Sequence, residues 1–270
     1  MLTLRSEREI QKMRCAGLLV WHALQIAGSM MRPGVKTAEI DERVERFFLD
    51  QKSIPLFKGV PGRVPFPAVT CISINEEIVH GIPGDRVLAE GDIVSVDTGC
   101  KLDGWCGDSA LTFPVGKVSD LAMRLMDVTQ HTLKIAIDSM ATCGFWSEIA
   151  QKMEAYVKEN GFSVVESLVG HGIGREMHED PQVPNYLCRE ILRHGDFKIQ
   201  PGLVIAVEPM VNVGSKRIHL EKDHWTIRTE DRKLSAHFEH TIAVNRGGVV
   251  VLTGPPVNDE EKIDISGYIN

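Results

Sequence analysis

Apolar residues recur at helical spacing in four segments of the chain, which form two consecutive pairs. The first helix is predicted to begin after Ser6, because Ser6 and Glu9 have the residue types and the spacing of a capping box. Its inward face repeats every three or four residues, at Ile10, Met13, Ala16, Val20 and Leu24. A second helix is predicted after Pro33-Gly34, with Thr37 as its N-cap.

The second pair of helices is predicted at about residues 119–140 and 147–160, where Gly161 ends the last helix. Short apolar segments between and after the pairs predict β-strands, at about residues 70–75, 93–98, 110–115, 163–169, 203–208, 238–244 and 249–252. The order helix, helix, strands thus occurs twice, around a midpoint near residue 118. Because the strands come in runs, the sequence predicts an α+β fold, with an antiparallel or mixed sheet covered by helices on one side.

Two aspartates are expected to lie close together in a hairpin around Asp103-Gly104, a strong signal for a two-residue hairpin turn. With that turn, Asp97 pairs with Ala110. Asp108 then lies diagonally opposite Asp97 on the same face, about 7–8 Å away between Cα atoms. Two such carboxylates repel each other unless a cation or a proton lies between them. The alternative is that both are solvent-facing strand residues near a turn.

Two glutamates lie where strands are expected to be buried. Glu208 follows an apolar run, and Glu239 shares a strand face with His237 and Thr241. Glu is rarely buried unless it is paired. A salt bridge to an arginine would explain each glutamate alone, but four acidic residues in such positions favour a shared cation. Together with His171 they suit two divalent ions, such as Co²⁺, Mn²⁺, Fe²⁺ or Zn²⁺, about 3.5–4 Å apart.

Residues 167–181, SLVGHGIGREMHEDP, combine glycines with two histidines. Three alternatives compete: a surface loop, a phosphate-binding glycine turn, or a backbone freed by glycine that points imidazoles into a site. The phosphate alternative is disfavoured because GHGIG lacks the pattern and the lysine of a P-loop. We expect the glycines to let the backbone turn tightly and approach the metals closely: Gly170, Gly172 and Gly174. His171 would then be a ligand, and His178 a donor to substrate.

Composition narrows the class of protein further. The chain has 270 residues, 25% of them charged, and a formal net charge of −7, so the bulk charge does not favour nucleic-acid binding. We expect one domain spanning residues 1–270. The six cysteines form no CxxC pair, which argues against a closed zinc site and favours free thiols in a cytoplasmic protein. No apolar run approaches the roughly 20 residues that span a bilayer, and we expect no secretion signal.

Five residues, in this order and in these strand contexts, resemble the dinuclear site of the pita-bread metallopeptidases: Asp97, Asp108, His171, Glu208 and Glu239. Longer motifs are similar to those of type I methionine aminopeptidases of the bacterial form: FPAVTCISINEEIVHGIP, GWCGDSALTFPVG, GHGIGREMHEDPQVPNY, IAVEPMVNVG and LSAHFEHTIAV. The resemblance extends over about residues 3–252. It implies a pseudo-twofold pita-bread fold and removal of the initiator methionine from nascent proteins whose second residue is small.

The resemblance also implies a role for each metal ligand. Asp97 would chelate one divalent ion, and His171 and Glu208 would bind the other. Asp108 and Glu239 would bridge the two ions. The physiological metal stays open, because an oxygen-rich ligand set accepts several ions and availability decides among them.

Three residues would act in catalysis by the same resemblance. Glu208 would transfer protons as well as bind metal. His178 would donate a hydrogen bond to the scissile carbonyl oxygen, and His80 would contact the scissile amide and assist the leaving amine. Taken alone, either histidine is more often a plain loop residue, but each lies in a matching motif.

The resemblance further implies a pocket for the methionine side chain, lined by Cys71, Phe66, Met177 and Trp225. Ordinary core packing explains Phe66 and Met177 nearly as well. A monovalent cation, Na⁺ or K⁺, would be held by backbone oxygens at Asn75, Glu77 and Ser235. Three features depart from the family pattern: residues 52–65 lack the usual aromatic pattern, Met177 replaces a common aromatic residue, and residues 214–224 form a longer segment.

Several alternatives share this fold. A prolidase or X-Pro aminopeptidase would use the same five ligands but carries an additional N-terminal domain, for which this chain has no room. A type II methionine aminopeptidase carries a helical insertion between the last two ligands. A non-catalytic peptide-binding relative would lose ligands. The resemblance favours a monomer that associates transiently with the ribosome and acts on nascent peptide N-termini, with no membrane partner.

Overall fold

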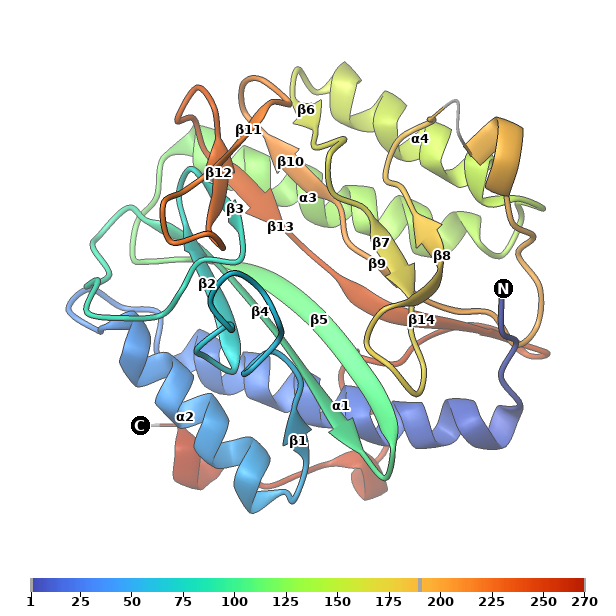
Figure 1. Ribbon diagram of the computed structural model, residues 1–270, viewed down its shortest axis with the longest axis horizontal. Helices are drawn as coiled ribbons and strands as arrows, with labels where there is room; N and C mark the ends of the chain where they lie inside the picture. The colour runs from blue at the N-terminus through green and yellow to red at the C-terminus, as the bar shows by residue number, and fades with distance from the viewer. Residues whose placement is uncertain (1, 189–190, 270) are drawn as a thin grey trace.

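The computed structural model describes residues 2–188 and 191–269 and places four long helices against antiparallel strands (Figure 1). The long helices are α1 (Glu7–Ser29), α2 (Thr37–Asp50), α3 (Asp120–Ser139) and α4 (Trp146–Glu159). The short helical segments are the π-helix η1 (Ile191–Gly195) and the 3₁₀-helices η2 (Asp259–Glu261) and η3 (Ser266–Tyr268).

The strands of the described residues form four antiparallel sheets, and the bounds of each strand follow in the order of pairing. In the first sheet, β1 (Ile54–Pro55) pairs with β4 (Ile93–Leu102), which also pairs with β2 (Thr70–Ile74) and β5 (Trp105–Pro114). The second contains β13 (Ser235–His237), β10 (Met210–Asn212) and β6 (Ser163–Val164). The third contains β11 (Ile218–Leu220), β12 (Ile227–Thr229) and β3 (Glu77–Val79). The fourth contains β15 (Gly248–Val251), β14 (His240–Asn245), β9 (Val204–Val207), β7 (Gly170–Gly172) and β8 (Glu179–Val183).

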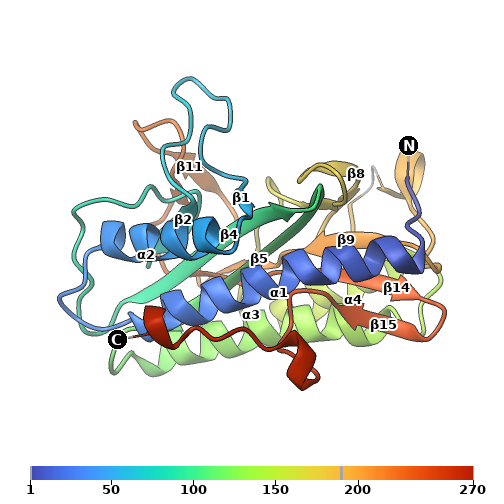
Figure 2. The ribbon, with the colours of Figure 1, turned by 90° about the horizontal axis from the view of Figure 1, so that it is seen from below.

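The helices lie together on one side of the strands, and the hairpins and long loops lie on the other (Figure 2). One apolar core packs α1 and α2 against β2, β4 and β5, and a second packs α3 and α4 against strands of the second half. The order helix, helix, strands thus occurs twice, as expected for a pseudo-twofold α+β fold. Both cores leave the opposite side of the strands free for a site.

The four helices were predicted correctly, and most of their caps as well. Ser6 accepts a hydrogen bond from the Glu9 N–H, and the Glu9 carboxylate accepts one from the Ser6 N–H. The prediction that Thr37 caps the second helix was wrong by one residue, since Lys36 is the N-cap. The Thr37 hydroxyl donates instead to the carbonyl of Gly84, which joins this helix end to the loop after β3.

The chain beyond β15 returns along the helical side of the molecule (Figure 2). The Arg14 guanidinium donates to the carbonyls of Leu252 and Gly254 and pairs with Glu261 at 2.7 Å. The Tyr268 ring packs edge-on against Phe47, 5.3 Å between centroids. This terminal segment therefore covers α1 and α2 and lies away from the opposite face. Among the described residues, no helix is long and apolar enough to cross a membrane.

Candidate metal centre

The β4–β5 hairpin brings two aspartates to one face. Its turn is Asp103-Gly104, with φ of +50° and +78°, as the two-residue turn requires. Asp97 is opposite Ala110, and Gly99 is opposite Asp108, so the predicted diagonal placement of the two carboxylates is confirmed.

Glu239 reaches the same face from the other half of the molecule. The prediction of a strand over 238–244 was wrong at its start, because β14 begins at His240 and Glu239 lies between β13 and β14. The Glu239 N–H donates to the carbonyl of Ala110 on β5 at 2.8 Å, and the Ser109 hydroxyl donates to the Glu239 carbonyl. These two hydrogen bonds lie outside the regular strand pairing and connect the second half of the chain to β5 in the first half. They place Glu239 beside Asp108.

His171 lies in a strand that the sequence did not predict. The predicted strand at 163–169 is only β6, whereas Gly170–Gly172 forms β7 between β8 and β9. Gly170 and Gly172 allow the neighbouring strands to approach β7 closely and do not form the tight turn that we expected. A Cβ at Gly170 would lie 2.3 Å from the carbonyl oxygen of Ala206, and one at Gly172 would lie 2.1 Å from that of Asp180.

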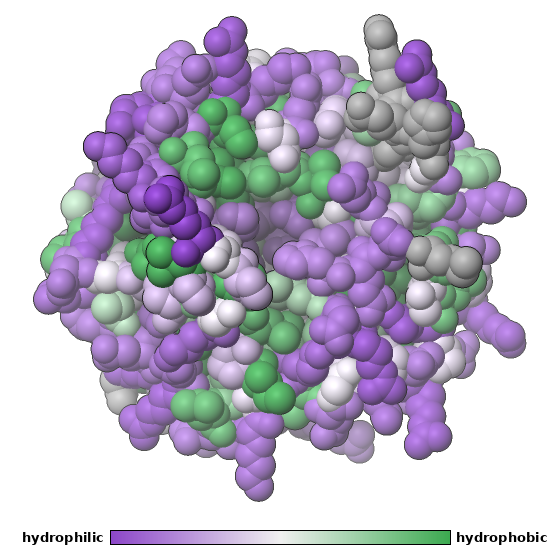
Figure 3. Space-filling model, viewed as in Figure 1, coloured by the Kyte–Doolittle hydropathy of each residue, from purple (hydrophilic) through white to green (hydrophobic). Residues whose placement is uncertain are grey.

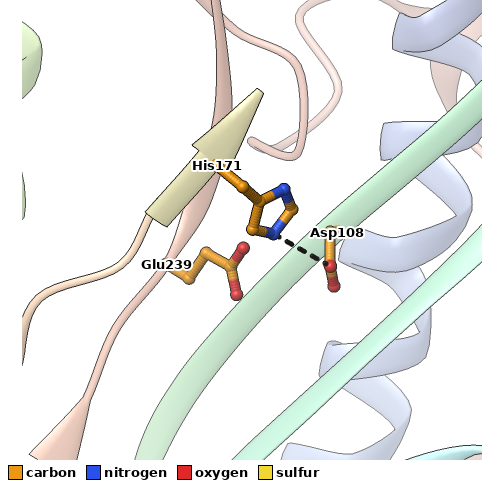
Figure 4. Close-up of side chains that lie close together, drawn as sticks. All are labelled: Asp108, His171 and Glu239. Carbon is orange, nitrogen blue, oxygen red and sulfur yellow. Dashed lines mark ion pairs between the residues drawn. The ribbon is translucent and has the colours of Figure 1, made fainter. Parts of the chain in front are cut away.

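Asp108, His171 and Glu239 lie close together, and the His171 ring faces the Asp108 carboxylate (Figure 4). His171 Nε2 lies 3.9 Å from Asp108 Oδ2 and 3.8 Å from Glu208 Oε1, and Glu208 follows β9. His171 Nδ1 donates to the Gly172 carbonyl at 2.9 Å, which leaves the Nε2 lone pair facing the carboxylates. Asp108, His171 and Glu239 each offer a ligand atom within 4.8 Å of the others.

Burial gives this cluster its electrostatic character. Asp108 and Glu239 are only 3% and 2% exposed. Burial raises the pKa of Asp108 to about 7. Burial and the nearby Asp108 carboxylate raise the pKa of Asp97, of Glu208 and of Glu239 well above their ordinary values. Burial and the neighbouring His178 lower the pKa of His171 to about 4, so its ring is neutral at pH 7.

Divalent cations fit this donor set. Buried oxygens of three carboxylates have no hydrogen-bond partner, namely Asp97 Oδ1, Asp108 Oδ1 and Glu239 Oε1. A lone pair of His171 faces the same acids. A cation would satisfy these atoms and favour the ionised carboxylates. Oxygen donors with one imidazole suit hard-to-borderline divalent ions.

The acids form the floor of a cavity of about 160 Å³. In Figure 3 the viewed face is hollowed near its middle, with hydrophobic side chains gathered beside the hollow. The cavity is lined by the five expected ligands, by His80 and His178, and by the four expected pocket residues: Cys71, Phe66, Met177 and Trp225. Trp225 packs edge-on against Phe66 and donates from Nε1 to the Val64 carbonyl at 2.7 Å.

The two histidines outside the ligand set lie at the cavity wall. His80 has a φ of +60° at the end of β3, and burial lowers its pKa to about 4. The exposed His178 ring lies 4.4 Å from the His171 ring between centroids. Both imidazoles therefore border the space in front of the acids.

Sequence reasoning missed three residues around the cavity. Phe57 and Val60 line it, although their segment, residues 52–65, showed no recognisable pattern. The third, His237, is 1% exposed and lies 3.9 Å from Glu208. The sequence places His237 on one strand face with Glu239 but indicates no role for it.

The expected monovalent-cation positions lie outside the lining of this cavity. The Asn75 carbonyl accepts a hydrogen bond from the Ser235 N–H at 2.8 Å, so β13 meets the turn before β3 here. Glu77, the third position, accepts a bond from the Ile74 N–H. The backbone segments expected to hold this cation are thus adjacent.

The sequence matches metallopeptidase family M24 over residues 11–246. It is 44% identical over 253 residues to methionine aminopeptidase 1 of Bacillus subtilis. The matched region covers 94% of this chain and 99% of that protein. The crystal structure of methionine aminopeptidase from Thermotoga maritima superposes with a TM-score of 0.88 at 37% identity, covering 94% of this chain and 100% of that one.

More distant structures share the fold alone. Prolidase from Pyrococcus furiosus superposes with a TM-score of 0.72 at 18% identity. The match covers 94% of this chain but only 66% of that protein. The similarity in sequence is thus much greater to the first group of relatives than to this one.

Proposed function

The chain belongs to the methionine aminopeptidases of metallopeptidase family M24, and from that premise we propose how its cavity removes an N-terminal methionine. The enzyme is a metal-dependent hydrolase and an exopeptidase. The observation that carries the proposal is the meeting, in one cavity, of four carboxylates and an imidazole with an apolar wall that contains Cys71, Phe66 and Trp225.

The proposed metal site holds two divalent ions. Four acidic side chains supply four negative charges when ionised, and His171 is neutral, so two divalent cations balance the set. Asp97 would bind one ion and His171 with Glu208 the other, with Asp108 and Glu239 shared. Ions bound there would supply Lewis acidity toward the peptide carbonyl and toward water.

The side chains of the cavity then divide the remaining work. Glu208, whose buried carboxylate has a raised pKa, accepts a proton from the attacking water and returns it to the leaving amine. His178 donates a hydrogen bond to the oxygen of the scissile carbonyl, where negative charge develops. His80, neutral at pH 7 because of its lowered pKa, contacts the scissile amide.

The apolar wall selects the side chain of the first residue. Cys71, Phe66, Met177 and Trp225 surround the space beside the acids. Sulfur and aromatic groups make favourable contacts with a thioether. We assign this space to the methionine side chain, and we propose that the second residue of the substrate is small, as the resemblance to methionine aminopeptidases implies.

A series of short peptides tests the function. With Mn²⁺ or Co²⁺, the purified protein should release methionine from Met-Ala-Ser and not from Met-Leu-Ser, as measured by chromatography of the free amino acid. Release from Ala-Pro peptides instead would favour an X-Pro peptidase. Failure to hydrolyse any of these peptides with either metal would favour a non-catalytic peptide-binding relative.

The setting of the reaction is also part of the proposal. The substrates would be the N-termini of nascent polypeptides in the cytoplasm, met by a monomeric enzyme that associates transiently with the ribosome. A monovalent cation, Na⁺ or K⁺, would bind the backbone at Asn75, Glu77 and Ser235. The adjacency of the Asn75 and Ser235 backbones supports this last assignment.

A further inference from the structure

His237 is a buried imidazole that the proposed reaction leaves without a role. It ends β13 and is 1% exposed. Neither Nδ1 nor Nε2 has a hydrogen-bond partner. Buried polar groups nearly always have a partner, because leaving one unpaired costs about 1–3 kcal/mol. A ring in this position therefore calls for a partner that forms when the site is in use.

The backbone of His237 is held firmly in place. The His237 carbonyl accepts a hydrogen bond from the Thr112 hydroxyl at 2.7 Å, and the His237 N–H donates to the Thr112 hydroxyl oxygen at 3.0 Å. The residue also pairs with Met210 on β10. Such anchoring fixes the direction from which the ring approaches the acids.

The ring is aimed at two carboxylates of the metal site. His237 Nε2 lies 3.9 Å from Glu208 Oε2 and 4.0 Å from Glu239 Oε2. The other oxygen of Glu208, Oε1, is 3.8 Å from His171 Nε2. Glu208 thus lies between two imidazoles, one facing each of its oxygens. The distance from His237 Nε2 to Glu208 Oε2 exceeds a normal N–H···O distance by about 1 Å, so a hydrogen bond between them requires a rotation of the carboxylate.

We propose that His237 is a positioning residue of the metal site, whose Nε2–H donates to Glu208 Oε2 and so turns Oε1 toward the metal. The inference rests on the proposed function, because it requires Glu208 to be a ligand. Outer hydrogen bonds to ligating groups fix their orientation and tune how strongly they bind metal. Here the bond would leave one oxygen of Glu208 for the ion and satisfy the other.

Three substitutions separate this role from simple packing. His237→Phe keeps a ring of similar size without a donor, His237→Met is a second apolar replacement, and His237→Gln supplies an N–H donor on a neutral side chain. Mn²⁺ affinity would be measured by titration calorimetry, the visible spectrum with Co²⁺ would be recorded, and thermal denaturation in EDTA would establish that each variant is folded.

We expect His237→Phe and His237→Met to bind Mn²⁺ about 10–100-fold more weakly than the wild type, and His237→Gln to bind close to wild type with an unchanged Co²⁺ spectrum. Wild-type affinity for Mn²⁺ in a folded His237→Phe or His237→Met variant would overturn the proposal. If His237→Phe does not fold, His237→Met provides the same test. Equal loss in the Gln variant, with an altered Co²⁺ spectrum, would overturn it too, since His237 would then be a ligand. Failure of the wild type to bind divalent metal would refute the proposed function instead.

Discussion

Asp108 is the residue whose charge affects the pKa of every other acid of the site. Its carboxylate is 3% exposed and lies near His171, and it raises the pKa of Asp97, Glu208 and Glu239 in addition to the effect of burial. Because Asp108 and Glu239 are buried and Asp97 and Glu208 are half-buried, none is easily ionised without a compensating cation. A single substitution here should therefore disturb the whole set.

Asp108→Asn removes one negative charge and one proposed bridge while keeping the shape of the side chain. We expect hydrolysis of Met-Ala-Ser to fall by more than the roughly 10–100-fold typical of losing an outer partner of a metal ligand. Initial rates at saturating Mn²⁺ would measure the loss.

Asp103→Asn is the matched control, because it removes a carboxylate from the turn of the same hairpin, outside the lining of the cavity. Asn is favoured at this position of a two-residue turn, so this variant should keep the wild-type rate. A near-normal rate for Asp108→Asn would show that two bridged ions are not needed.

At the scale of elements, the site depends on one very short strand. β7 contains only Gly170–Gly172, yet it lies between β8 and β9 and carries His171. Its neighbours approach so closely that side chains at its two glycines would overlap carbonyl oxygens. The direction of the His171 ring is thus set by backbone packing as well as by its own hydrogen bond to Gly172.

Gly172→Ala tests this dependence. The added Cβ would lie 2.1 Å from the Asp180 carbonyl oxygen, so β7 or β8 must shift. We expect a loss of about 1–3 kcal/mol in the free energy of unfolding, as for other overpacked sites, together with a loss of peptidase activity. Urea denaturation and peptide hydrolysis would measure the two effects.

Gly144→Ala provides the comparison, since a Cβ there meets no atom within 4 Å and the residue has no positive φ. It should be neutral or stabilising by about 0.4–1 kcal/mol, with normal activity. If Gly172→Ala behaved like this control, the close approach of β7 to β8 would not hold His171 in place.

At the scale of the whole molecule, the site joins the two halves of the fold. Asp97 and Asp108 come from the first half, whereas His171, Glu208 and Glu239 come from the second. In the described structure several hydrogen bonds join the halves, among them those of Glu239 with Ala110 and of His237 with Thr112. Metal bound here would link them further and should stabilise the folded chain.

Metal removal should therefore lower the melting temperature. A ligand that binds only the native state at 100 times its Kd adds about 2.7 kcal/mol of stability. Thermal denaturation in excess Mn²⁺ and in EDTA would reveal the shift, which should be much smaller in Asp108→Asn. Identical melting temperatures for the wild type in both solutions would contradict binding of Mn²⁺ to the native site.

The sequence by itself determined the long elements and the identity of the chemistry. The four helices follow from repeated apolar spacing and local caps, and the hairpin register from Asp103-Gly104, because each depends on residues close together in the chain. The candidate ligands could be named because buried strands seldom contain unpaired acids. Resemblance to a family then ordered these residues into roles.

Only the tertiary structure decided how these residues meet. The short strands carry too few residues for a periodic pattern, so β7 and β8 could not be predicted, whereas the apolar run of β9 was. Phe57 and Val60 reach the cavity through loop packing, and the direction of the His237 ring depends on Thr112, which is distant in sequence. Long-range backbone hydrogen bonds and close strand approach set these positions, and neither leaves a local pattern in the order of the residues.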